Sequence, residues 1–332
     1  MTKAILKSSA FLFSLLLNLP IALVQAHVIS NENNLTKNNR ALNFSIPQKM
    51  IFDKDRVELD APIGDGILQS PILTAFINGQ GPFHLMFDTG FAQSLISLSL
   101  AKSLKLPIMT SKTALHETPN QLVKVIEDHY LVEDLKIGDI ELRDYFFVVS
   151  SGFEDDIKDL KELHVDGVLS ANAFYPLVFT IDYKQEKIFL EKKSLEKSMP
   201  NVISYAKSSS VPNLKATLTF SKLKREMTQD MIVDTGCGYY IFVNSCEVPE
   251  MTLFRGKQNL THYDYTGMEE TKYFAQLYGD IKISPDHVLK SPYITFGSVH
   301  CDSGNPKGLL GRKFFEQYTV TIDPVNELIQ IN

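Results

Sequence analysis

Leu85-Met86-Phe87-Asp88-Thr89-Gly90 returns 146 positions later as Met231-Ile232-Val233-Asp234-Thr235-Gly236. Each copy is an apolar run followed by Asp-Thr-Gly. The apolar runs predict buried strands, and the Thr-Gly pairs predict tight turns after them. Each copy therefore places one carboxylate at the end of a buried strand. A lone buried carboxylate is strongly unfavourable, whereas two that meet can share one proton.

A second pair of segments repeats downstream of the first. Asp166–Phe174 precedes the strand-like run Phe179–Tyr183, and Lys307–Phe315 precedes the run Val320–Pro324. In both halves, 14 positions separate the first glycine of the segment from the isoleucine of the run. The Asp-Thr-Gly aspartate lies 79 positions before that glycine in the first half and 74 in the second. Two motifs repeated in register predict a tandem duplication.

The composition is that of an ordinary globular protein. A chain of 332 residues can hold two domains, and 44% hydrophobic with 22% charged residues is typical of soluble folds. The net charge of -6, with no basic block, argues against a nucleic-acid surface. The eight histidines show no metal-ligand spacing. We therefore expect no bound metal.

Residues 1–26 have the pattern of a secretory signal peptide. Two lysines precede an apolar run from Ala10 to Val24, and small residues follow it. A membrane anchor is the alternative, but the run is short and contains Asn18 and Pro20. We expect export to the periplasm or the medium, with no membrane span after cleavage. In an oxidising compartment one disulfide is expected, and its pairing is open among three cysteines: Cys237, Cys246 and Cys301.

The remaining chain divides into three parts. Residues 27–60 are polar and Asn-rich, which predicts a mobile arm with one strand. Residues 61–200 and 201–332 each contain one copy of the repeated motifs, which predicts two lobes. Residues 191–213 are rich in Lys and Ser and contain two prolines, as expected of an exposed connection.

These motifs resemble the retropepsin and pepsin superfamily of aspartic peptidases, and in particular bacterial retropepsin-like proteins. The resemblance covers residues 71–332, with one lobe in each half. It implies an all-β, bilobal fold in which each lobe is a small closed β-barrel. Leu309-Leu310-Gly311 would pack behind a catalytic loop, and Asp88 and Asp234 would face each other across a cleft.

The chemistry of paired carboxylates fits this resemblance. Aspartic proteases are the standard example of two carboxyl groups sharing one proton. The ionised member takes a proton from water, and the protonated member donates a hydrogen bond to the carbonyl that is attacked. No metal or organic cofactor is required. The sequence leaves open which acid carries the proton, because titration belongs to the pair.

The residues around the two acids have supporting roles in the family. The resemblance implies that the hydroxyls of Thr89 and Thr235 bond across to the opposite loop. Gly90 and Gly236 allow the backbone to approach the carboxylates closely. An ordinary turn after a strand is the alternative for each copy taken alone, because Asp and Gly are common there.

Four positions depart from the family pattern. Phe91 and Cys237 stand where pepsin-like enzymes commonly have Ser or Thr beside the carboxylate. Without that hydroxyl donor the charged form is less stabilised, which predicts a less acidic working pH. Ser170 stands where the family usually has Gly, and Lys307 stands in place of Asp.

The family also has a hairpin that closes over the substrate. The resemblance places it within residues 113–124 in the first lobe and 261–273 in the second. Tyr263, Tyr265 and Gly267 form the candidate flap of the second lobe, where a tyrosine could exclude water from the acids. The alternative is that they are ordinary strand residues.

The sequence thus predicts an aspartic endopeptidase that cuts an extended peptide bound between its lobes. Because both acids lie on one chain, we expect a monomer. A non-catalytic peptide- or partner-binding module of the same fold is the main alternative. Another is a pair of independent lobes that each associate with a second chain. Carboxylates far apart, or an aromatic ring between them, would favour the binding module.

Overall fold

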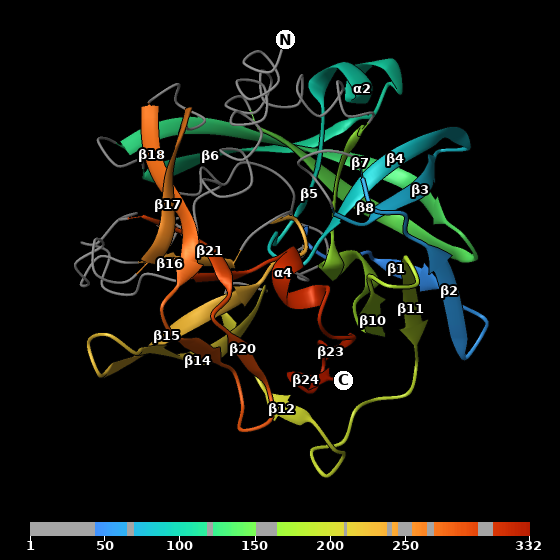
Figure 1. The fold of residues 1–332 in the computed structure, drawn as a ribbon. Helices are drawn as coiled ribbons and strands as arrows, with labels where there is room; N and C mark the ends of the chain where they lie inside the picture. The colour runs from blue at the N-terminus through green and yellow to red at the C-terminus, as the bar shows by residue number, and fades with distance from the viewer. Residues whose placement is uncertain are drawn as a thin grey trace.

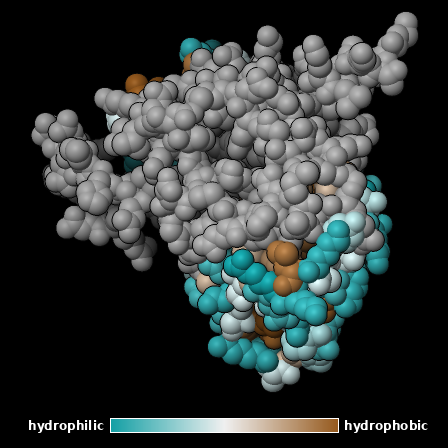
Figure 2. Space-filling model, turned by 60° about the vertical axis from the view of Figure 1, so that its left-hand side comes forward, coloured by the Kyte–Doolittle hydropathy of each residue, from teal (hydrophilic) through white to brown (hydrophobic). Residues whose placement is uncertain are grey.

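The computed structural model describes residues 44–64, 70–117, 122–150, 165–208, 211–237, 241–244, 254–263, 269–297 and 308–332. Within these ranges the chain is all-β, as predicted, and its strands form two curled lobes joined by a third sheet (Figure 1). None of the described helices is long and apolar enough to cross a membrane. On the face in Figure 2, the described surface is mainly hydrophilic, with small separate hydrophobic groups.

Lobe one is an eight-stranded sheet that closes on itself. An additional pairing of β8 with β7 joins the ends of a six-strand ring formed by β8, β5, β9, β4, β3 and β7. The closed barrel predicted for this lobe is therefore present. In sheet order the strands are β1 (Lys49–Ile51), β8 (Ile140–Ser150), β5 (Ser94–Ile96), β9 (Gly167–Ser170), β4 (Gln80–Asp88), β3 (Ile72–Ile77), β7 (Leu122–Ile137) and β6 (Ile108–Glu117).

Lobe two is a curled sheet of ten strands. Its described strands do not close into a ring, in contrast to the barrel expected for this lobe. In sheet order they are β17 (Phe254–Tyr263), β18 (Glu269–Leu277), β21 (Tyr293–Gly297), β16 (Ile241–Asn244), β22 (Gly308–Leu310), β15 (Arg225–Val233), β14 (Val211–Phe220), β19 (Asp280–Lys282) and β20 (Val288–Lys290), with β13 (Ala206–Ser208) paired to β14.

A six-stranded sheet joins the two lobes. Its central strands, β10 and β23, come from the two repeated runs and pair antiparallel, with Thr180 opposite Thr321. The hydroxyls of these two threonines are 2.8 Å apart. The order is β12 (Val202–Ser204), β24 (Leu328–Ile331), β23 (Val320–Asp323), β10 (Val178–Asp182), β11 (Lys187–Glu191) and β2 (Arg56–Asp60).

The chain before residue 61 contains two strands, where the sequence predicted one. β1 pairs with β8 of lobe one, and β2 pairs with β11 of the joining sheet. Val57 and Leu59 of β2 are buried, while Arg56, Glu58 and Asp60, which alternate with them, are exposed. This alternation is the pattern of a half-buried strand. With only two apolar residues, the strand is difficult to recognise within a polar stretch of sequence.

The helices are short and lie next to strands that carry the site. α2 (Leu98–Ser103) begins after Ser97, whose hydroxyl accepts from the N–H of Leu100. The 3₁₀-helix η1 (Ala171–Phe174) follows β9, and α4 (Arg312–Phe315) follows β22. α4 lies at the centre of the molecule, between the strands of both lobes (Figure 1).

The apolar runs before the two aspartates are core strands, as predicted. Leu85–Phe87 are completely buried, and Met231–Val233 are at most 3% exposed. Phe87 packs against Phe174 and Phe179, with ring centroids 5.8 Å away in each case. Burying each such side chain contributes about 1.5–3 kcal/mol, so the strands that end at the acids are firmly held.

Candidate active site

The two Asp-Thr-Gly loops occupy equivalent places in their lobes. In lobe one, β4 and β5 lie on either side of β9, and Asp88 at the end of β4 is opposite Ser170. In lobe two, β15 and β16 lie on either side of β22, and Val233 is opposite Leu310. The N–H of Asp234 donates to the carbonyl of Leu310 at 3.0 Å. The segment after each repeated glycine therefore supports the loop from behind, as the resemblance implied.

Two threonines join the loops to each other. The N–H of Thr89 donates to Thr235 Oγ1 at 3.0 Å, and the N–H of Thr235 donates to Thr89 Oγ1 at 3.1 Å. The Thr235 hydroxyl donates to the carbonyl of Phe87 at 2.9 Å, and the Thr89 hydroxyl donates to the carbonyl of Val233. Both threonines are about 1% exposed or less. Four buried hydrogen bonds thus connect the end of β4 to the end of β15.

Each glycine lies against the carboxylate of the opposite loop. A Cβ atom on Gly236 would lie 2.1 Å from Asp88 Oδ2, and one on Gly90 would lie 2.6 Å from Asp234 Cγ. A side chain at either position would overlap the carboxyl group. These contacts explain why both positions are glycine, and they bring Asp88 and Asp234 to one point between the lobes.

The hydrogen bonds to the two carboxyl groups leave one oxygen without a donor. Asp88 Oδ1 accepts from the N–H of Gly90 at 2.6 Å, and Asp234 Oδ1 accepts from the N–H of Cys237 at 3.0 Å. Asp88 Oδ2 is buried and has no ordinary hydrogen-bond donor among the described residues. Two ionised carboxylates can only accept, so no bond can join them in that state. A proton on either carboxyl group would supply this donor and let the two side chains hydrogen-bond to each other.

Burial favours such a shared proton. It raises the pKa of Asp88 to about 6, against the opposing effect of the Gly90 N–H. Burial also raises the pKa of Asp234 well above its ordinary value, and the negative charge of Asp88 raises it further. The pair therefore loses its two protons in separate steps. Between these two steps it carries one proton and one negative charge. This is the state that general acid–base chemistry requires.

The structure describes part of the predicted flap regions. β6 and β7 form a hairpin across residues 113–124 of lobe one, and its tip at residues 118–121 lies outside the described residues. Tyr263 is the last residue of β17 and pairs with Glu269 of β18. Tyr265 and Gly267 lie outside the described residues. Their role as a flap stays a prediction.

Tyr183 is a residue of the site that the sequence did not reveal. Its side chain is buried, its hydroxyl has no hydrogen-bond partner among the described residues, and its ring stacks on Phe315 with centroids 5.5 Å apart. Burial raises its pKa well above 10, and the charges of Asp234 and Cys237 add to this effect. Tyr183 is thus a neutral group near the acids. The only signal in the sequence is that it follows Asp182, where the second repeat has Pro324.

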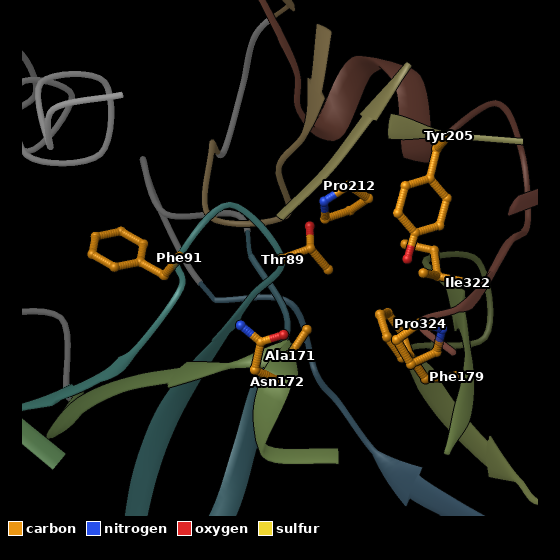
Figure 3. A pocket seen from close by; sticks show the side chains of 9 residues that line it. All are labelled: Thr89, Phe91, Ala171, Asn172, Phe179, Tyr205, Pro212, Ile322 and Pro324. Atoms are coloured by element: carbon orange, nitrogen blue, oxygen red, sulfur yellow. The ribbon is translucent and has the colours of Figure 1, made fainter. Parts of the chain in front are cut away.

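A small cavity lies where the lobes meet, close to Thr89. Its volume is about 20 Å³, enough for one water molecule and too small for a peptide side chain. Figure 3 shows Thr89 facing the cavity from one side, Tyr205 and Ile322 on the other, and the ring of Phe91 pointing away from Thr89.

Comparison with known families agrees with this geometry. The family described as aspartyl protease matches residues 73–173, which contain the first Asp-Thr-Gly and the segment that supports it. No curated protein matches the chain at a significant level. The match over residues 73–173 supports a likeness to pepsin- and retropepsin-like aspartic peptidases.

Proposed function

We propose that the protein is an aspartic endopeptidase that hydrolyses peptide bonds with water activated by Asp88 and Asp234. The observation that carries the proposal is the reciprocal contact at the dyad. Each carboxyl group lies within 3 Å of where a Cβ of the opposite glycine would stand. Two buried acids held that close share a proton, and an acid and a base are then present at one point.

The reaction follows from this protonation state. The ionised carboxylate takes a proton from water as the water oxygen attacks the peptide carbonyl. The protonated carboxyl donates a hydrogen bond to the carbonyl oxygen, on which negative charge develops. The tetrahedral intermediate collapses when the C–N bond breaks, and the amine leaves with a proton from the pair. The products are a carboxylic acid and an amine, and the acids return to their starting state.

The substrate is proposed to be an extended peptide lying between the lobes. Exposed strand edges bind such peptides through backbone hydrogen bonds, with alternate side chains in pockets. Both acids come from one chain, which supports a monomer as the active form. The pairing of Thr180 with Thr321 at the centre of the joining sheet supports an origin by tandem duplication. The pattern of residues 1–26 supports export to the periplasm or the medium.

The binding-module alternative gains no support from the site. The contacts of Gly90 and Gly236 with the opposite carboxyl groups leave no room for an aromatic ring between Asp88 and Asp234. A binding module would have no use for two buried acids whose pKa values are raised by burial. Removing either would make the protein more stable.

The test is cleavage of a peptide library by the protein and by its Asp88→Asn and Asp234→Asn variants, followed by mass spectrometry across pH 3–8. Asp139→Asn is the control, because Asp139 is exposed and pairs with Lys54 in lobe one. We expect each dyad variant to lose on the order of 10²- to 10⁴-fold or more in kcat, and the control to keep full activity. Unchanged cleavage by both dyad variants would overturn the proposal. So would a folded native protein that cuts no peptide at any pH.

A further inference from the structure

The lobe-one catalytic loop is held by two buried side chains that approach it from behind. Ser170 Oγ donates to the carbonyl of Phe91 at 2.6 Å, and Asn172 Nδ2 donates to the carbonyl of Ala92 at 2.9 Å. Ser170 is completely buried, and Asn172 is 9% exposed. The two acceptors are the residues directly after Gly90. Both carbonyls of the outgoing loop are therefore fixed by side chains from the β9–η1 segment.

Lobe two holds its loop in a different way. Gly311 is the counterpart of Ser170, because each is the fifth residue of its repeated segment. Gly311 has no hydroxyl, and the carbonyl of Cys237 accepts from the backbone N–H of Arg312 at 3.1 Å. The lobe-two bond comes from the backbone alone, whereas lobe one depends on the serine hydroxyl. A side-chain substitution at position 170 can therefore remove the bond that holds the lobe-one loop, whereas the corresponding bond in lobe two does not depend on a side chain.

A chain of buried hydrogen bonds supports Ser170 from the barrel interior. The N–H of Ser170 donates to Ser94 Oγ at 2.9 Å, and Ser94 Oγ and Tyr145 Oη are 2.7 Å apart. Ser94 is 1% exposed and Tyr145 is completely buried. Ser170 Oγ also accepts from the N–H of Asn172 at 3.2 Å. Every polar group of this chain of contacts has a partner, which makes it a rigid support.

We propose that Ser170 is a positioning residue that orients Phe91 and thereby aims the backbone N–H groups of the loop at Asp88. The proposal rests on the function proposed above. The N–H of Gly90 donates to Asp88 Oδ1 at 2.6 Å, and the N–H of Phe91 is directed at the same carboxyl group. Position 91 is phenylalanine, so the loop offers no hydroxyl of its own to the carboxylate. The hydroxyl at position 170 compensates by fixing the backbone donors.

Weakening the support of the lobe-one loop should shift the pKa of Asp88 in a direction that can be measured. Backbone N–H donors stabilise the charged form of Asp88 and oppose the effect of burial on its pKa. If the Phe91 carbonyl loses its partner, the donors are held less well and the charged form is less favoured. The pKa of Asp88 then increases, and the acidic limb of the rate profile moves to higher pH.

The experiment compares the full chain with its Ser170→Ala variant, using kcat and KM on one library-derived peptide across pH. The matched control is Ser284→Ala, which removes a hydroxyl bonded to His287 Nδ1 at 2.6 Å in lobe two, away from both loops. For Ser170→Ala we expect kcat to decrease about tenfold with KM nearly unchanged. We also expect the acidic limb to shift upward by about half a pH unit or more. Ser284→Ala should leave kcat, KM and the limb unchanged.

A second readout does not need turnover. The ¹³Cγ chemical shift of Asp88 can be titrated in both proteins, and we expect the same upward shift in Ser170→Ala. If the native chain cuts no peptide, the proposed function fails while this titration still tests the positioning role. If Ser170→Ala does not fold, Tyr145→Phe removes only the hydroxyl behind Ser94, and a smaller shift in the same direction is expected. A variant with lower thermal stability but an unmoved Asp88 titration and unmoved kcat would show that Ser170 is only structural.

Discussion

Thr89 and Thr235 hydrogen-bond to each other twice, each backbone N–H donating to the hydroxyl of the other at 3.0 and 3.1 Å. Each hydroxyl then donates to a carbonyl of the opposite strand, that of Phe87 or Val233. All four bonds are buried and link segments 144–148 positions apart in the chain. The distance between the two carboxylates is therefore set by this pair of threonines, and not by either lobe alone.

Replacing Thr235 by valine should destabilise the protein strongly and lower its activity. The substitution keeps the shape but leaves the Thr89 N–H and the Phe87 carbonyl buried without their partners. Each unsatisfied group costs about 1–3 kcal/mol, so we expect a loss of about 2–5 kcal/mol in the free energy of unfolding. Urea-induced unfolding of both proteins measures this loss. Thr321→Val is the control, because it removes one hydroxyl contact in the joining sheet. An equal loss in the two variants would show that Thr235 has no special role.

Alanine at position 236 should lower the activity, because its methyl group would displace the carboxyl group of Asp88. The added methyl group would lie 2.1 Å from Asp88 Oδ2, so the carboxyl group must move. A displacement of about 1 Å at a reacting group costs on the order of 10²-fold in rate. Gly79→Ala serves as the control, because nothing lies within 4 Å of its Cβ position, although its φ of +72° makes the substitution mildly strained. Activity in Gly236→Ala equal to that of Gly79→Ala would contradict the site geometry.

Asparagine at position 88 should make the protein more stable at neutral pH while removing its activity. The folded-state pKa of Asp88 is about 6, against an ordinary value of 3.8. The folded protein therefore binds more protons than the unfolded chain between these values, and the free energy of unfolding decreases as pH rises through that window. The decrease is up to about 3 kcal/mol. Melting temperatures at pH 4.0 and 7.5 test this. The gain from Asp88→Asn should be larger at pH 7.5, and a variant less stable than the native protein there would refute the assignment.

His129 should make the protein sensitive to acid. Its side chain is completely buried, both ring nitrogens lack partners among the described residues, and its ring packs 4.6 Å from Phe44. Burial lowers its pKa to about 4, and the charge of Lys112 adds to this, against the opposing charges of Glu127 and Asp128. Its contribution to stability is fully present above pH 6.5 and is lost as pH falls towards 4.

The corresponding measurement is the difference in unfolding free energy between pH 4 and pH 7. His129→Phe keeps a ring against Phe44 and cannot gain a proton, so its difference should be smaller than that of the native protein. The same difference in both proteins would mean that His129 does not respond to acid in this range.

The sequence predicted the parts of the fold that local patterns encode. Apolar residues before Asp88 and Asp234 identify the buried strands, and the matched spacing of the downstream glycines indicates a second supporting segment in each half. Only one of the two strands before residue 61 was predicted, because their partners are far away along the chain. β2, for example, pairs with β11 more than 120 positions away, and only tertiary contacts decide such a pairing. The support from Ser170 was missed for a similar reason. The sequence shows an unusual serine, but its acceptor on Phe91 is known only from the folded backbone.

The central claim is most directly tested by the pH dependence of kcat/KM for the native chain. Because burial raises the pKa of Asp88 to about 6 and raises that of Asp234 well above its ordinary value, kcat/KM should increase as pH rises through the first ionisation of the pair and decrease through the second. Substituting either aspartate should abolish this bell-shaped profile together with the activity. A maximum at the strongly acidic pH of a pepsin-like enzyme would contradict the raised pKa values of the pair. An unchanged profile in Asp234→Asn would contradict a pair that shares one proton.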